Sequence, residues 1–248
     1  MKILYEIDKK DIREVKMFYE SQKDKSFVKN RIKRNIDKNI PSYSNDIFWQ
    51  AMISCLITTQ QRSGPYSVVT SFILTKPFPL NYQECRTQKN LKEFAGGIIS
   101  RFGLRRGKTI GEEIEENFHW LENGGWETIE DIIEELSNFQ DASTERKSAE
   151  IIIDHLKGFG PKQSRNLLQS LGLTKYEIPV DSRITKWLTD FGFPIKLSAS
   201  ALGDKHYYNF VLDAVQKTCE ASDIFPCVLD AAIFASYDED WPEDRLIW

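Results

Sequence analysis

Apolar residues recur at three- and four-residue steps along most of the 248-residue chain, and this spacing constrains the fold more than any other feature of the sequence. One face of a first amphipathic helix would carry Ile12, Val15, Phe18 and Tyr19. The apolar stretch at 47–57 contains Ala, Met and Gln, so it predicts a buried helix rather than a strand. No two alternating runs joined by a two-residue turn are evident. The sequence therefore predicts an all-α protein.

Further helices are predicted along the rest of the chain, at about 68–74, 90–100, 106–121, 127–139, 144–157, 162–171, 182–190, 205–221 and 225–236. Short connections rich in Gly, Asn or Pro are expected between several of them, at Gly96-Gly97, at Asn123-Gly124-Gly125 and at 158–161. Gly172 and Gly192 follow two of the helices, where left-handed C-terminal caps are expected.

The composition is that of an ordinary folded protein, with 41% hydrophobic and 28% charged residues. No apolar run approaches the roughly 18–20 residues that cross a bilayer. The first residues turn charged after five positions, unlike a secretory signal. We therefore expect a soluble intracellular protein, in the cytoplasm and nucleoid or in the nucleus, with no membrane partner.

Charge and cysteine content leave the partner open. The net charge is −4, but two basic runs at 25–38 and 101–108 are either solvated faces or local phosphate contacts. The four cysteines are Cys55, Cys85, Cys219 and Cys227. None forms a Cys-x-x-Cys pair, so neither a zinc site nor an iron–sulfur cluster is predicted. The last two are expected to be buried thiols on consecutive helices.

The segment at 151–188 carries the most information about function. An apolar helix ends at Leu156, a Gly-Phe-Gly-Pro turn follows, and a second amphipathic helix starts near Lys162. Gly158 and Gly160 permit a tight hairpin and a close approach of backbone to a ligand. Pro161 presets the first turn of the second helix, whose free N–H groups suit a DNA phosphate. We predict a helix-hairpin-helix element that holds DNA phosphate without reading sequence.

This hairpin and the residues after it resemble the signature of the helix-hairpin-helix base-excision DNA glycosylases, in particular the 8-oxoguanine DNA glycosylases. The signature is L-x-G-x-G-x-K, a helix, a loop and P-V-D, and it is matched by Leu156, Gly158, Gly160, Lys162, Pro179, Val180 and Asp181. A weaker resemblance covers about 48–237. Within it, the segment 56–62 looks like the one that fills the gap left by an extruded base, and 103–108 resembles the turn that opens the next helix.

The chemistry of base removal explains the lysine and the aspartate. Breaking an N-glycosidic bond builds positive charge on the sugar, which the carboxylate of Asp181 would stabilise. The amine of Lys162 would attack C1′ and form a Schiff base that permits β-elimination. The attack requires the neutral amine, a form that a helix N-terminus and desolvation both favour. The alternative is that Lys162 only contacts phosphate and Asp181 only caps the helix at Ser182.

Family members that lack this lysine use water, so the resemblance implies both glycosylase and lyase activity. The target nucleotide must leave the stack. Gln60, with Gln61 and Arg62 beside it, is predicted to contact DNA at the resulting gap. The alternative is that the two glutamines are a polar pair that caps helix ends.

Asp230 and Phe234 are four residues apart and would share a helix face. The carboxylate can accept the N1–H and 2-amino groups of a guanine while the ring stacks on its plane. The spacing is similar to a polar-x-x-x-aromatic pair of 8-oxoguanine glycosylases. The aspartate departs from the glutamine of the eukaryotic form and looks closer to an archaeal branch. Alternatively, Phe234 is core and Asp230 pairs with an arginine.

Two further comparisons favour an oxidised purine as substrate. Endonuclease III and the adenine glycosylases usually carry four C-terminal cysteines, and only Cys219 and Cys227 lie there. The alkyladenine branch usually lacks the hairpin lysine. The resemblance thus implies a bifunctional DNA glycosylase and AP lyase that excises 8-oxoguanine. The alternatives are a monofunctional glycosylase for another lesion and a non-catalytic helix-hairpin-helix DNA-binding protein.

The resemblance also implies the architecture, with two helical lobes and a DNA-binding cleft between them. One lobe would span 50–175 and include the hairpin, and the other would join 1–49 to 176–248. The expected partner is duplex DNA with a damaged base, bound by a monomer. No metal or cofactor is expected for the reaction, although the family's hairpin can hold a structural monovalent cation through backbone carbonyls.

Overall fold

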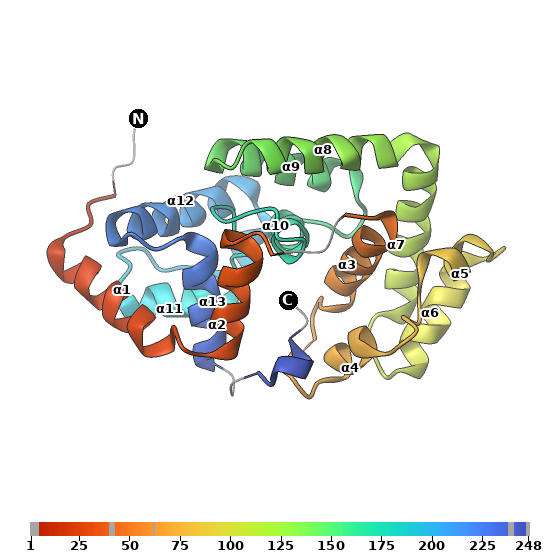
Figure 1. The fold of residues 1–248 in the computed structure, drawn as a ribbon, viewed down its shortest axis with the longest axis horizontal. Coiled ribbons are helices and arrows are strands. Elements are labelled where there is room, and N and C mark those ends of the chain that lie inside the picture. The colour runs from red at the N-terminus through yellow and green to blue at the C-terminus, as the bar shows by residue number, and fades with distance from the viewer. Residues whose placement is uncertain (1–4, 40–42, 62, 238–240, 247–248) are drawn as a thin grey trace.

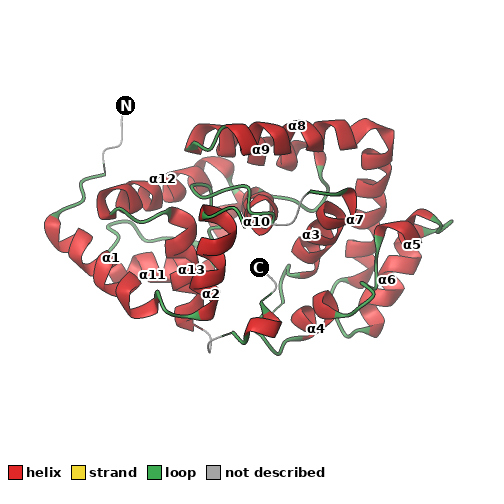
Figure 2. Ribbon diagram, viewed as in Figure 1, coloured by secondary structure: helices red, strands yellow, loops and turns green. Residues whose placement is uncertain are grey.

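A computed structural model describes residues 5–39, 43–61, 63–237 and 241–246, and within these ranges the chain forms helices and loops but no strand (Figures 1 and 2). The predicted all-α class is confirmed. The longer helices are α1 (Lys9–Gln22), α3 (Asn45–Ile57), α6 (Leu91–Arg101), α7 (Gly107–Trp120), α8 (Trp126–Asn138), α9 (Ala142–His155), α10 (Pro161–Ser170), α11 (Ser182–Phe191), α12 (Lys205–Ser222) and α13 (Pro226–Tyr237).

Shorter elements lie between them. These are α2 (Ser26–Arg31), α4 (Val68–Leu74), α5 (Tyr82–Arg86), and single turns of other helix types at Ile32–Ile36, Leu121–Gly125, Ala199–Gly203 and Glu243–Arg245. Gly172 and Gly192 have φ angles of 75° and 98°, which confirms the two predicted left-handed caps. Among the described residues, no helix is long and apolar enough to span a bilayer.

The predicted connection at Gly96-Gly97 is wrong, because both glycines lie inside α6. Their place is explained by the tight packing of α6 on α7. A Cβ on Gly96 would come within 3.0 Å of the carbonyl oxygen of Gly107, and a Cβ on Gly111 would come within 2.3 Å of the carbonyl oxygen of Lys92. The small residues serve contact between two helices and not a turn.

The helices gather into two groups on either side of α10 (Figure 1). On one side α1 and α2 pack against α12 and α13, so the N-terminal helices join the C-terminal part of the chain. On the other side α3 packs against α4, α5 and α7. We propose that this grouping corresponds to the lobes predicted at 50–175 and at 1–49 plus 176–248.

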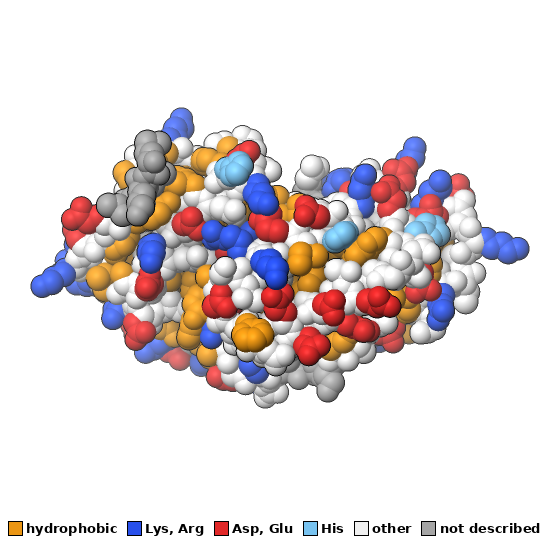
Figure 3. Space-filling view, turned by 90° about the horizontal axis from the view of Figure 1, so that it is seen from above, with side chains coloured by type: hydrophobic (Ala, Val, Ile, Leu, Met, Phe, Trp, Pro, Cys, Tyr) orange, Lys and Arg blue, Asp and Glu red, His pale blue; other side chains and the backbone are white. Residues whose placement is uncertain are grey.

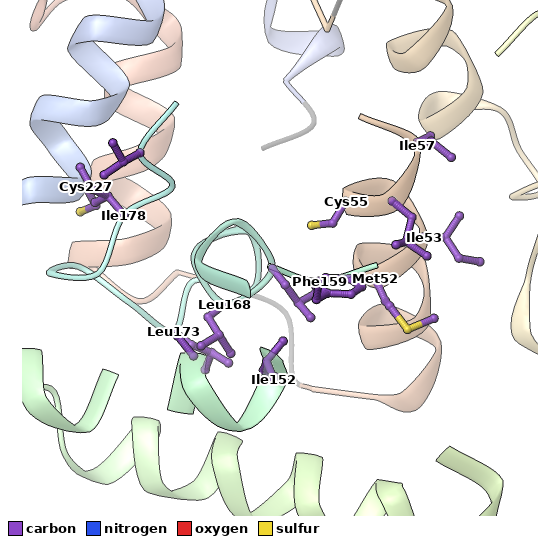
Figure 4. Packing of buried hydrophobic residues seen from close by; sticks show 14 of the residues in the cluster. Met52, Ile53, Cys55, Ile57, Ile152, Phe159, Leu168, Leu173, Ile178 and Cys227 are labelled. Atoms are coloured by element: carbon purple, nitrogen blue, oxygen red, sulfur yellow. The ribbon is translucent and has the colours of Figure 1, made fainter. Parts of the chain in front are cut away.

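The hairpin before α10 is anchored in the hydrophobic core (Figure 4). Phe159, at its tip, is 5% exposed and points toward Met52 of α3. Farther along α10, Leu168 lies with Ile152 of α9 and with Leu173. Because α10 contacts both α3 and α9, its N-terminus is held in one orientation relative to the rest of the molecule.

Part of the basic run at 25–38 is buried, so the run as a whole is neither a solvated face nor an open phosphate site. Arg31 is 4% exposed and Asn35 is fully buried. The side-chain amide of Asn35 donates to the carbonyl oxygens of Gln169 (2.9 Å) and Thr174 (2.8 Å). Burial also lowers the pKa of Arg34 well below its usual value. The sequence interpretation missed this because the contacts of the run are made with distant parts of the chain.

Candidate active site at the hairpin

The two glycines of the hairpin lie in different surroundings. Gly158 has a φ of 84°, and a Cβ there would lie 2.7 Å from Leu56 and 2.8 Å from the carboxyl carbon of Glu113. Packing and backbone conformation therefore both require glycine at 158. Gly160 has an extended backbone, and no described atom lies within 4 Å of the position of its Cβ. The protein itself therefore does not require glycine at 160, and the space beside it is open to a ligand.

Helix α10 begins at Pro161, as predicted, so Lys162 lies in its first turn. Among the described residues, Lys162 forms no ion pair with a carboxylate. It lies close enough to the buried Cys55 to affect it electrostatically. Burial raises the pKa of that thiol to about 12, against the influence of Lys162, so Cys55 is a neutral packing residue and not a nucleophile.

The predicted capping of α11 by Asp181 is confirmed. Its Oδ1 accepts hydrogen bonds from the backbone N–H groups of Arg183 (2.8 Å) and Ile184 (3.3 Å). Its Oδ2 accepts one from the guanidinium of Arg183 (3.1 Å). The side chain is 25% exposed. The backbone N–H groups of the cap bind Oδ1 alone, so capping does not exclude a chemical role for Oδ2.

Four residues predicted from distant segments line one small cavity of about 60 Å³. Lys162 comes from α10, Asp181 from the cap of α11, and Asp230 and Phe234 from α13. The other lining residues are Phe27, Arg31, Thr58, Ser63, Asn166, Gln169, Pro179 and Arg183. An amine, two carboxylates and an aromatic ring therefore meet in one place.

The partners of Asp230 and Phe234 were not found from the sequence. Arg31 pairs with Asp230 at 2.9 Å, and the ring of Phe27 stacks on that of Phe234 with centroids 4.5 Å apart. The guanidinium of Arg183 lies over the ring of Phe234, at 4.4 Å from its centroid. The predicted alternative that Asp230 pairs with an arginine is thus confirmed, and the arginine is Arg31. A signal was present, because Phe27 and Arg31 have the same four-residue spacing as the pair they meet.

The electrostatics of the cavity reflect its burial. Burial raises the pKa of the Asp230 carboxyl, Arg31 opposes that rise, and the negative charge of Asp181 adds to it. The two carboxylates therefore interact, although one is buried and the other is partly exposed. A ligand in the cavity could donate hydrogen bonds to the carboxylate of Asp230 and accept them from the guanidinium of Arg31.

The turn after α3 is tied to the hairpin and to the turn before α7. Gln60 is exposed and has a φ of 59°, a conformation that strains a residue other than glycine. Gln61 is engaged within the protein, because its amide donates to the carbonyl oxygen of Ile57 (2.7 Å) and accepts from the N–H of Arg105 (2.9 Å). The predicted DNA contact Arg62 lies outside the described residues.

The segment 103–108 forms the predicted turn before α7, which begins at Gly107. Arg106 donates to the hydroxyl of Thr59 (2.6 Å) and to Oε1 of Glu113 (3.2 Å). Burial raises the pKa of Glu113, and its buried Oε2 has no hydrogen-bond partner among the described residues. This unpaired oxygen beside Gly158 fits a cation near the hairpin.

Two other parts of the surface offer less to a nucleic acid. On the face that carries α8, α9 and α12, acidic and basic side chains are interspersed (Figure 3). A larger hollow of about 670 Å³ has a mostly uncharged lining with three acidic residues, Asp213, Glu220 and Asp223, and one lysine, and it contains none of the predicted site residues. Neither feature provides the basic track that a phosphate backbone requires.

Comparisons with solved structures identify the fold. The 8-oxoguanine glycosylase/lyase of Methanocaldococcus jannaschii, in complex with a 15mer DNA containing 8-oxoguanine, aligns with a TM-score of 0.68 at 17% identity, covering 90% of this chain and 96% of that one. A structure of the 8-oxoguanine DNA glycosylase from the same organism aligns with a TM-score of 0.65 at 16% identity, covering 94% and 97%.

The 8-oxoguanine DNA glycosylase of Thermotoga maritima aligns with a TM-score of 0.62 at 16% identity, covering 91% of this chain and 94% of that one. No family model matches the sequence, and no curated protein matches it. The predicted resemblance is confirmed at the level of the fold, which is the all-helical fold of these archaeal and bacterial 8-oxoguanine DNA glycosylases.

Proposed function

We propose that this protein is a DNA glycosylase and AP lyase that removes an oxidised guanine from duplex DNA through a Schiff base on Lys162. The observation that carries the proposal is the meeting of Lys162 and Asp181 in one cavity within this fold. The lysine in the first turn of α10 and the carboxylate that caps α11 both line this cavity.

The reaction proceeds by attack of the Lys162 amine on C1′ of the extruded nucleotide. A bond forms between Nζ and C1′ while the bond from C1′ to the base breaks, and its electron pair leaves with the base. Loss of a proton from the nitrogen and opening of the sugar ring give the Schiff base. Removal of a proton from C2′ then expels the 3′ phosphate and cuts the strand.

Asp181 stabilises the positive charge that develops on the sugar during this attack. Asp181 lines the cavity and its Oδ2 carries no backbone hydrogen bond, so Oδ2 can face the sugar while Oδ1 holds the cap. For Asp181 to stabilise the sugar fully, Arg183 has to leave Oδ2, because a carboxylate paired with a guanidinium is a weaker stabiliser of a second cation.

The damaged base enters the cavity next to Asp230 and Phe234. An oxidised guanine fits the polar groups, because its N1–H and 2-amino donors match the carboxylate of Asp230 and its O6 acceptor matches the guanidinium of Arg31. The cavity of about 60 Å³ is far below the roughly 300 Å³ at which ligand pockets begin. Entry of a base therefore requires the side chains over Phe234, such as Arg183, to move.

The DNA backbone is held at the start of α10. The free N–H groups of its first turn and the open space beside Gly160 suit a phosphate. The exposed Gln60 contacts the gap that the extruded base leaves, while Gln61 holds the turn in place. A monovalent cation at the hairpin would be held by backbone carbonyls close to Glu113, and it would order the hairpin rather than take part in the reaction.

The proposal is tested by following base release and strand cleavage separately on a duplex with one 8-oxoguanine opposite cytosine. Wild type should do both. Asp181→Asn keeps an N-cap side chain, so it should remain folded and lose roughly 100–1,000-fold in base release, the size of loss seen for single charge-stabilising groups. Asp190→Asn, an exposed change on α11, is the matched control and should behave as wild type.

Other results would point to the alternatives. Base release without strand cleavage would favour a monofunctional glycosylase in which Lys162 is idle. Salt-dependent duplex binding with no base release from any lesion would favour a non-catalytic DNA-binding protein. Near-normal turnover by Asp181→Asn would remove this residue from the reaction.

A further inference from the structure

The hydroxyl of Tyr208, on α12, lies against the loop that leads to Asp181. It accepts a hydrogen bond from the backbone N–H of Val180 (2.7 Å) and donates one to the carbonyl oxygen of Ile178 (2.7 Å). The same N–H and carbonyl also face each other across Pro179 at 3.0 Å. One hydroxyl therefore closes a three-residue turn, and the next residue of the chain is Asp181.

The ring of Tyr208 reaches toward the other candidate catalytic residue. The guanidinium of Arg165 lies 5.1 Å from the ring centroid. Arg165 belongs to α10, three residues after Lys162, and its Nη1 donates to the carbonyl oxygen of Pro161 at 3.4 Å. A continuous set of contacts thus runs from the residue before Asp181 to the residue before Lys162.

This set of contacts is buried, and ion pairs hold Arg165 in place. Arg165 and Tyr208 are both 0% exposed, so neither can contact DNA. The Nε of Arg165 donates to Oε2 of Glu177 (2.9 Å), and Oε1 of Glu177 accepts from Arg146 (2.9 Å). Charge-assisted hydrogen bonds on a buried carboxylate fix the plane of the guanidinium. The ring of Tyr208 therefore packs on a guanidinium whose orientation is fixed.

We propose that Tyr208 is a positioning residue, whose hydroxyl fixes the 178–181 loop and so sets the place of the Asp181 carboxylate relative to the Lys162 amine. The inference rests on the proposed function. During base release the amine attacks the same sugar whose charge the carboxylate stabilises, so both groups must be aligned at once. Without the hydroxyl, only the 3.0 Å contact across Pro179 would hold the turn.

The test compares Tyr208→Phe with Tyr207→Phe. The first variant keeps the ring and its contact with Arg165 and removes only the hydroxyl. The second is a matched control on the same helix, because the Tyr207 hydroxyl also accepts a backbone N–H, but that of Ser198 (2.8 Å), outside the 178–181 loop. Single-turnover base release from the 8-oxoguanine duplex is measured with enzyme in excess, together with its amplitude, duplex affinity and the melting midpoint.

Tyr208→Phe should slow base release by roughly 10–100-fold, the cost of a misplacement of about 1 Å, with amplitude and duplex affinity within about threefold of wild type. Tyr207→Phe should keep the wild-type rate constant. If Tyr208→Phe does not fold, 4-aminophenylalanine at 208 retains a donor for Ile178 and a poor acceptor for Val180, and the same slower release is expected.

Three outcomes would contradict the inference. A purely structural tyrosine would lower the amplitude or the melting midpoint and leave the rate constant of the folded fraction unchanged. Equal slowing in Tyr207→Phe would show a general effect of α12. A wild type that is active and a Tyr208→Phe variant that matches it would overturn this inference alone, whereas a wild type that releases no base from any duplex would overturn the proposed function as well.

Discussion

At the scale of single residues, the cavity is organised by one buried ion pair. Arg31 and Asp230 lie 2.9 Å apart, with side chains 4% and 11% exposed. Burial raises the pKa of Asp230 and the guanidinium opposes that rise, so each charge depends on the other for its place away from water. Phe27 and Phe234 stack beside them, so the pair also fixes the aromatic wall of the cavity.

Asp230→Ala should therefore affect stability and selectivity together. The change leaves the Arg31 charge buried without its partner, and the free energy of unfolding should fall by about 3–5 kcal/mol. Activity on the oxidised guanine should fall more than affinity for undamaged duplex. Chemical denaturation and a comparison of the two DNA substrates measure these effects.

The double variant Arg31→Met with Asp230→Leu separates the two roles of the pair. It removes both charges, so it should recover much of the stability while the selectivity stays lost. Equal losses of lesion excision and of undamaged-duplex affinity in Asp230→Ala would contradict the placement of the base beside this residue.

At the scale of elements, α9, the hairpin and α10 act as one unit fixed on α3. Gln163 of α10 donates to the carbonyl oxygen of Cys55 and to the hydroxyl of Thr58 (3.2 Å). Phe159 inserts toward Met52. The hairpin is thus held to α3 on each flank, by Phe159 before Pro161 and by Gln163 after it. The bond to Thr58 also ties the turn that carries Gln60 to α10. An element whose backbone must present N–H groups to a ligand benefits from such support.

The two hairpin glycines should respond differently to alanine. Gly158→Ala places a Cβ against Leu56 and Glu113 at a positive φ, so it should cost about 1–3 kcal/mol or more in the free energy of unfolding. Gly160→Ala meets no described atom, so its melting midpoint should stay near that of wild type while duplex affinity falls. Thermal melts and duplex titrations measure both. Normal duplex affinity in a folded Gly160→Ala variant would contradict a phosphate contact there.

At the scale of the whole molecule, the parts that could be predicted are those whose determinants are close in the sequence. The helices, the caps at Gly172 and Gly192, and the Gly-Pro hairpin each depend on residues within a few positions. An arginine partner for Asp230 was one of the alternatives, but the sequence did not identify it as Arg31, which lies 199 positions away. Gly96 was misassigned for a similar reason, since its role is set by contact with another helix.

The same limit applies to the site. Lys162 and Asp181 could be singled out because they are nineteen positions apart in one motif, whereas Arg183 and Tyr208 gain their roles from packing that only the fold reveals. The fold also decides where charge is concentrated, which the composition does not show. A chain with a net charge of −4 can still present a local phosphate site at one helix N-terminus.

The central claim is the covalent role of Lys162, and borohydride trapping on a duplex with one 8-oxoguanine opposite cytosine tests it most directly. Wild type should form a reduced covalent complex with DNA, with the cross-link on Lys162 by peptide mapping. Lys162→Gln should form none while binding the duplex nearly as well. Trapping that survives in Lys162→Gln, or a cross-link mapped to another residue, would contradict the account.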